Sequence, residues 1–177
     1  MIAYVDASAL VKRYLIERGS RATIELTSTA EMIATSTISR AEVAAGLAKA
    51  VRAGIVADDV ARNAQRSFAR DWPDFLRVPV TEALVDRAEA LAWEHALRGY
   101  DAVQLASALT WQESVGTEIV VATFDTQLWK AVRQAGMTAW PDNLTAPGQP
   151  PTRLGTPEPE TPRDTLHRNP AKRNEPE

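Results

Sequence analysis

The chain has 177 residues, of which 45% are hydrophobic and 24% charged, with a net charge of −3 and a pI of about 5.5. These values are ordinary for a globular protein, and they argue against one that holds nucleic acid by a broad positive field. The absence of cysteine excludes disulfides, thiolate metal sites and a cysteine nucleophile, and it fits a reducing cytoplasm. No signal peptide is recognisable, and no apolar stretch approaches the roughly 20 residues of a membrane helix. We therefore expect a cytoplasmic protein that does not bind membranes.

Strand and helix patterns alternate from residue 1 to about residue 143. In chain order they predict a strand at 2–5, helices at 8–17 and 21–29, a strand at 32–35, helices at 39–53 and 58–72, a strand at 76–80, helices at 82–97 and 101–114, a strand at 119–122, a helix at 127–135 and a strand at 137–140. Pro79 favours an edge position for its strand. Strands separated by one or two helices predict right-handed parallel crossovers, and hence a three-layer α/β/α sandwich with a central parallel sheet.

The segment 144–177 has a different composition. Eight of the eleven prolines lie in it, and its few large apolar residues are isolated. Such a segment does not bury enough apolar surface to offset the entropy lost on ordering. We therefore predict one domain at 1–143, followed by a Pro-rich disordered tail.

Four acidic residues occupy related positions in this pattern. Asp6 ends the first apolar run, Asp125 follows the run 119–122 by three residues, and Glu42 and Asp101 lie in the first turns of predicted helices. In parallel α/β sheets, ligands bind beyond the carboxyl ends of the strands, where such residues can meet. Clustered carboxylates repel one another unless a cation neutralises them. An oxygen-only ligand set favours Mg²⁺ or Mn²⁺, and such a site indicates phosphodiester chemistry.

Each acid also has a purely structural interpretation. Ser39 and Glu42 match a capping box, which taken alone is the better explanation of Glu42. Asp6 and Asp125 are suitable N-caps, and Asp101 suits the dipole at a helix start. The conjunction still favours a metal site, because Asp6 and Asp101 each adjoin an apolar segment that we expect to be buried.

Other catalytic motifs are absent from the sequence. It lacks a P-loop, a dinucleotide fingerprint, a serine nucleophile elbow and a zinc signature, and its only histidines are His95 and His167. Two other classes of protein remain open. One is an aspartate-based phosphoryl-transfer domain, although Ser8 stands where a dehalogenase-type site needs a second acid. The other is a non-catalytic interaction module whose acids only cap helices.

Four segments together resemble the PIN-domain nucleases, and most closely the VapC toxins of bacterial toxin–antitoxin pairs. The segments are 5–12 (VDASALVK), 39–43 (SRAEV), 99–108 (GYDAVQLASA) and 122–128 (ATFDTQL). The resemblance implies a Rossmann-like fold and a Mg²⁺-dependent endoribonuclease. It also implies Asp6 and Asp101 as the main metal ligands. Glu42 and Asp125 complete the acidic site, and hydroxyl groups at Ser8 and Thr123 support the acids.

The resemblance further implies partners: an RNA substrate, a second copy of the chain in a homodimer, and a cognate small antitoxin. Such an antitoxin lays a helix in an apolar groove and sends a basic segment into the acidic site, which is built to attract cations. Lys12 and Arg13 lie about one helical turn or more beyond Asp6 and are candidates for phosphate contact.

Overall fold

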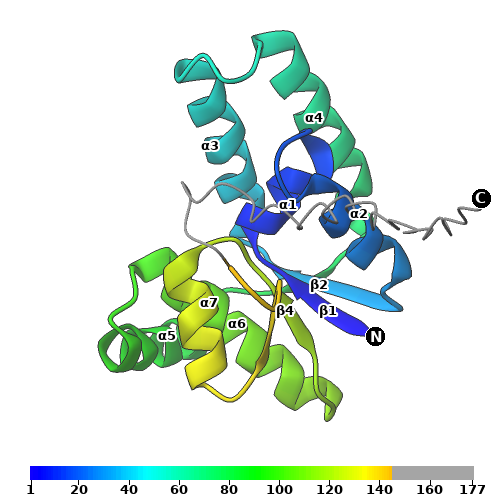
Figure 1. Ribbon diagram of the computed structural model, residues 1–177. Helices are drawn as coiled ribbons and strands as arrows, with labels where there is room; N and C mark the ends of the chain where they lie inside the picture. The colour runs from blue at the N-terminus through cyan, green and yellow to red at the C-terminus, as the bar shows by residue number, and fades with distance from the viewer. Residues whose placement is uncertain (145–177) are drawn as a thin grey trace, which may run out of the picture. The chain divides into compact units, whose positions relative to one another are not determined.

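The structure, a computed structural model, describes residues 1–144. A five-stranded sheet lies between two layers of helices (Figure 1). The elements are β1 (Ile2–Val5), α1 (Ala7–Tyr14), α2 (Ser20–Thr29), β2 (Met32–Ser36), α3 (Ser39–Arg52), α4 (Asp58–Asp71), the short 3₁₀ helix η1 (Trp72–Asp74), β3 (Leu76–Val78), α5 (Glu82–His95), α6 (Gly99–Val115), β4 (Val120–Ala122), α7 (Thr126–Gln134) and β5 (Thr138–Trp140). Apart from Leu144, the predicted tail lies outside the described residues. None of the described helices combines the length and apolarity of a membrane span.

All neighbouring strands are parallel, in the order β3-β2-β1-β4-β5. From β1, the chain adds β2 and then β3 on one side of the sheet, and it then returns to place β4 on the other side of β1. The strand order therefore reverses between β1 and β4, and open α/β sheets bind their ligands at such a reversal. The predicted α/β/α sandwich is confirmed. β3 lies at an edge and ends at Val78, directly before Pro79.

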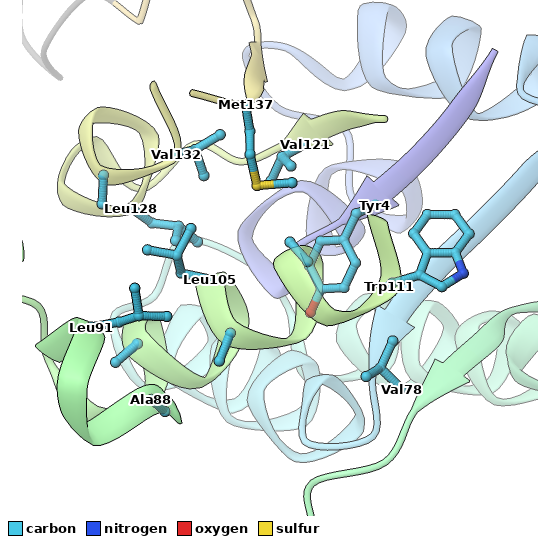
Figure 2. Packing of buried hydrophobic residues seen from close by; sticks show 14 of the residues in the cluster. Tyr4, Val78, Ala88, Leu91, Leu105, Trp111, Val121, Leu128, Val132 and Met137 are labelled. Atoms are coloured by element: carbon cyan, nitrogen blue, oxygen red, sulfur yellow. The ribbon is translucent and has the colours of Figure 1, made fainter. Parts of the chain in front are cut away.

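Each face of the sheet is covered by a separate apolar core. Tyr4 and Val121, which are register partners on β1 and β4, contribute to the core beneath α5, α6 and α7 (Figure 2). Ala3 and Val5 alternate with Tyr4 and contribute to the core with α1, α3 and α4. Complete burial of a side chain such as Leu105 contributes about 1.5–3 kcal/mol. The two cores hold both helix layers against the sheet and so fix the positions of the loops at its edge.

Helix α1 ends at Tyr14, three residues before the predicted end at Glu17. The chain turns there and enters α2 through Gly19, which has a φ of +95°. A Cβ atom at Gly19 would lie 2.8 Å from the ring of Phe124, in the loop after β4. The positive φ and the close approach both require glycine at this position, and they bring the α1–α2 loop against the β4 loop.

Candidate active site

Asp6 lies at the junction of β1 and α1, where its backbone and side chain are both held. Its backbone N–H donates to the Ala122 carbonyl at the end of β4 (3.0 Å). Its Oδ2 atom accepts from the Ser8 backbone N–H (3.1 Å), the Ser8 hydroxyl (2.5 Å) and the Thr123 hydroxyl (2.9 Å). Asp6 is the N-cap of α1 and is only 5% exposed. Ser8 and Thr123 therefore contact Asp6 directly and fix the direction of its carboxyl group.

The hydroxyl groups of Ser8 and Thr123 also hold the backbone at Asp125. The Ser8 hydroxyl accepts from the Phe124 backbone N–H (2.8 Å), and the Thr123 hydroxyl accepts from the Asp125 backbone N–H (3.1 Å). The Oδ1 atom of Asp125 caps α7 by accepting from two of its backbone N–H groups. The predicted N-cap role of Asp125 is confirmed, and this role leaves the residue beside the junction of β1 and β4.

Glu42 has a different local role from the predicted one. The N-cap of α3 is Ile38, and Ser39 is the first helical residue, without a capping hydrogen bond. The Ser39 hydroxyl instead lies 2.8 Å from the Thr35 hydroxyl and accepts from Gln104 Nε2 (2.9 Å). The capping-box interpretation of Glu42 is therefore wrong. Its Oε2 atom accepts from Gln104 Nε2 (2.5 Å), which connects α3 to α6.

Asp101 is the third residue of α6, in the first turn, as predicted. Its Oδ2 atom is buried and has no hydrogen-bond partner. A buried carboxylate oxygen without a partner is costly, because it has lost its hydration without replacement. This atom is available to a cation or to a donor on a ligand.

The four carboxyl groups form one electrostatic cluster. Burial raises the pKa of Asp6 above its ordinary value, against the hydrogen bonds from Ser8 and Thr123. Burial, followed by the charges of Asp6 and Asp101, raises the pKa of Glu42 to about 7. Burial, followed by the charges of Asp125 and Asp6, raises the pKa of Asp101 to about 6, although Arg98 opposes this shift. The structure thus links all four predicted acids: the charges of Asp6 and Asp101 act on Glu42, and the charges of Asp125 and Asp6 act on Asp101.

These shifts predict how stability depends on pH in the metal-free protein. Glu42 and Asp101 have folded pKa values of about 7 and about 6, above ordinary values of 4.5 and 3.8. Because these carboxyl groups bind protons more tightly in the folded state, protonation stabilises the fold. This stabilisation is complete below the ordinary pKa values of the two groups and is lost as the pH rises through 6 and 7. Glu42→Gln removes one such charge. It should raise the melting temperature of the metal-free protein at about pH 8, where Glu42 is ionised, and change it little at about pH 4. A variant that melts below the wild type at the higher pH would contradict this.

The donor set fits a hard divalent cation with water completing its coordination. Among residues 1–144, no three acidic or histidine side chains are already grouped as ligands around one point. Mg²⁺ commonly takes only one or two protein carboxylates and keeps several waters. Two carboxylates, such as those of Asp6 and Asp101, would therefore be enough in number, and the unpartnered Asp101 oxygen supplies an unused donor. All four clustered side chains offer oxygen only.

The two basic residues predicted to contact phosphate lie on different sides of α1. Lys12 Nζ is 3.0 Å from Glu17 Oε1 and 4.5 Å from the ring centroid of Phe124, the residue before Asp125. Arg13 instead lies 3.8 Å from Asp71 and lines a hollow beside the amino-terminal end of β2. The structure therefore brings Lys12 to the loop beside the acids but places Arg13 near the amino-terminal ends of the strands, away from the acids.

The polar residues that hold Glu42 were not predicted from the sequence. Gln104 donates to both Glu42 and Ser39, and it accepts from the Tyr4 hydroxyl (2.6 Å). A signal for Gln104 was present in the sequence, because this long polar side chain interrupts the largely apolar run 102–108. In the structure, all residues of that run except Val103 are buried. A long amide in such a run must find partners inside the protein.

Comparison with known proteins agrees with the geometry. A family model described as the PIN domain matches residues 3–134. "Ribonuclease VapC45" of Mycobacterium tuberculosis is 35% identical over 144 residues, which cover 81% of this chain and 97% of that protein. The chain therefore belongs to the PIN-domain family. Within that family, it is of the VapC type.

Solved structures share the fold. VapBC2 from Rickettsia felis, bound to a DNA fragment from its promoter, matches with a TM-score of 0.54 and 14% identity, over 78% of this chain and 97% of the other. FitAcB from Neisseria gonorrhoeae matches with a TM-score of 0.51 and 21% identity, over 78% and 96% of the two chains. At these identities the matches show a common fold and nothing further.

Proposed function

We propose that this protein is a Mg²⁺-dependent endoribonuclease and the toxin of a toxin–antitoxin pair. The observation that carries the proposal is the cluster of four acids, Asp6, Glu42, Asp101 and Asp125. The cluster lies where the strand order reverses between β1 and β4, in a chain of the VapC type. The relative from Mycobacterium tuberculosis is named as a ribonuclease, which supports RNA as the substrate. An RNA substrate also favours action in the cytoplasm.

The roles of the residues follow from their positions. Asp6 and Asp101 would hold Mg²⁺, or Mn²⁺, with Ser8 and Thr123 fixing the direction of the Asp6 carboxylate. When bound, such a metal polarises a phosphate and makes water a better nucleophile. Glu42 and Asp125 border the same space, where their oxygens can orient the attacking water and accept its proton. This chemistry needs no side-chain nucleophile, in agreement with a chain that lacks cysteine and has two histidines.

Mapping of RNA ends in cells tests the assignment directly. Expression of the wild-type chain should create new RNA ends at a limited set of sequences, and Asp6→Asn should not. The variant is a suitable control because Asn remains a good N-cap for α1. The same end pattern in both strains would refute the proposed nuclease.

An apolar hollow of about 510 Å³ supports an antitoxin partner. It lies between the end of α1 and the start of α4, and it is bordered by three exposed apolar side chains: Ile16 (103% exposed), Ile55 (77%) and Val60 (47%). Apolar groups exposed together around a hollow are typical of a surface that receives the apolar face of a helix. The acidic cluster would attract a basic segment of the same partner.

A second apolar hollow, of about 400 Å³, lies between α5 and α6. Val85 and Tyr100 line it at 43% and 63% exposure, and Trp93 extends the apolar surface on α5 at 85% exposure. We propose this face as the homodimer interface, because aromatic residues are enriched where protein surfaces meet and single chains rarely expose them together.

The two surfaces can be separated by paired substitutions. Trp93→Asp should convert the dimer to a monomer in light scattering and leave inhibition by the antitoxin largely intact. Ile55→Asp should weaken inhibition and leave the mass unchanged. Both side chains are mostly exposed, so neither change should greatly lower the melting temperature. A dimeric Trp93→Asp protein would contradict the proposed interface, and undiminished inhibition of Ile55→Asp would contradict the proposed groove.

A further inference from the structure

A buried polar connection runs from the central strand to the acidic cluster. The Tyr4 hydroxyl on β1 donates to Gln104 Oε1 on α6 (2.6 Å), and Gln104 Nε2 donates to Glu42 Oε2 on α3 (2.5 Å). Tyr4 is fully buried and Gln104 is 1% exposed. Figure 2 shows Tyr4 among the apolar side chains of this core. Polar groups at such depth are tolerated when they are hydrogen-bonded, so this connection is part of the packed interior.

The chemistry of the partners determines which way the Gln104 amide points. A carboxylate such as Glu42 only accepts hydrogen bonds, so the amide nitrogen must face it. The amide oxygen then faces Tyr4, whose hydroxyl must donate. The Glu42 carboxylate thus excludes the flipped amide, in which the amide oxygen would face it, and the Tyr4 hydroxyl holds that oxygen on the other side.

Glu42 needs such a restraint because its neighbours repel it. Asp6 and Asp101 carry charges of the same sign that act on Glu42, and the Glu42 side chain is only partly buried. A glutamate has three rotatable side-chain bonds and gains entropy when released to solvent. Gln104 is the hydrogen-bond donor that opposes this release, and Ser39 holds the same amide nitrogen from the side of α3.

We propose that Gln104 is a positioning residue that holds the Glu42 carboxylate within the acidic cluster, and that the Tyr4 hydroxyl holds the amide oxygen of Gln104 in place. The proposal rests on the proposed metal-dependent nuclease. Residues that hydrogen-bond to metal-site carboxylates typically change metal affinity or activity by about 10–100-fold when replaced. Loss of Gln104 should therefore weaken the site without removing any of its four acids.

The test uses Gln104→Met, with Gln112→Met as a matched control. Gln112 lies two turns further along α6 and accepts from the Ile119 backbone N–H, away from the acids. Binding of Mn²⁺ is measured by electron paramagnetic resonance, and the Mg²⁺ dependence of RNA cleavage is measured alongside. Gln104→Met should raise the half-saturating metal concentration by at least about 10-fold. Tyr4→Phe should act in the same direction with a smaller effect, and Gln112→Met should match the wild type.

Introducing Gln104→Met into the Glu42→Gln variant distinguishes a positioning role of Gln104 from a general packing defect. If Gln104 acts through the Glu42 carboxylate, Gln104→Met causes little further loss of Mn²⁺ affinity in that background. Equal losses in both backgrounds, or a Gln104→Met protein that binds Mn²⁺ like Gln112→Met, would overturn the inference. In either case a wild type that needs metal to cleave RNA leaves the proposed function standing. A wild type that binds no Mn²⁺ and cleaves no RNA would overturn both.

Discussion

Replacement of Asp101 by Asn is expected to abolish RNA cleavage while the metal-free protein becomes more stable. The change removes one of the two proposed metal ligands. Its effect should therefore exceed that of losing a residue that only supports a ligand, and we expect the rate of cleavage to fall by more than about 100-fold. It also removes a negative charge from a cluster in which burial, Asp125 and Asp6 already raise its pKa to about 6. The melting temperature at about pH 8, where Asp101 is ionised, should therefore rise.

A matched control is Asp58→Asn, which changes an acid in the first turn of α4 that is paired with Arg62. This substitution should leave cleavage unchanged, since Asp58 lies outside the acidic cluster. If Asp101→Asn retained activity within a few-fold of the wild type, Asp101 would be better explained as a helix-end residue than as a metal ligand. The loss of such a helix-end interaction costs only about 1 kcal/mol of stability.

Chelation of divalent metal is expected to stop cleavage completely, and excess Mg²⁺ or Mn²⁺ should restore it. Without a cation, the clustered carboxylates repel an incoming phosphate as well as one another. Restored metal should also raise the melting temperature, because a ligand present at 100 times its Kd adds about 2.7 kcal/mol to the stability of the state that binds it.

Asp6→Asn provides the control for that experiment, since its melting temperature should respond little to Mg²⁺. Undiminished cleavage in EDTA would show that the metal-dependent mechanism is wrong. A stable acyl phosphate on Asp6 would instead favour the aspartate-based phosphoryl-transfer alternative. The Oδ2 atom of Asp6 is a poor nucleophile in this structure, because it already accepts three hydrogen bonds from Ser8 and Thr123.

The fold was predictable because it depends on local patterns. Apolar runs of strand length alternate with helical periodicity, and the strand Ile2–Val5 and the helix end at Thr29 lie where the pattern predicted them. The location of Asp6 and Asp125 at the same edge of the sheet was predictable for the same reason, since both follow parallel strands. That β1 and β4 are neighbours does not follow from local pattern, and this pairing brings Thr123 against Asp6.

The details that sequence analysis missed depend on contacts between distant segments. Ser39 matched a capping residue, but its hydroxyl bonds to Thr35 and Gln104, and only the packed structure brings these residues together. Lys12 and Arg13 are adjacent in sequence, yet successive residues on a helix point about 100° apart. Arg13 therefore lies beside Asp71, near the amino-terminal end of β2 and away from the acids.

The most direct test of this account is a crystal of the protein soaked in Mn²⁺, with the metal located by its anomalous scattering. The account predicts a peak at a coordination distance of about 2.0–2.2 Å from carboxylate oxygens of both Asp6 and Asp101, with water completing the shell. Glu42 and Asp125 should border the same peak directly or through water. An ordered crystal with no peak at the carboxyl ends of β1 and β4, or with Mn²⁺ bound only elsewhere, would contradict the central claim.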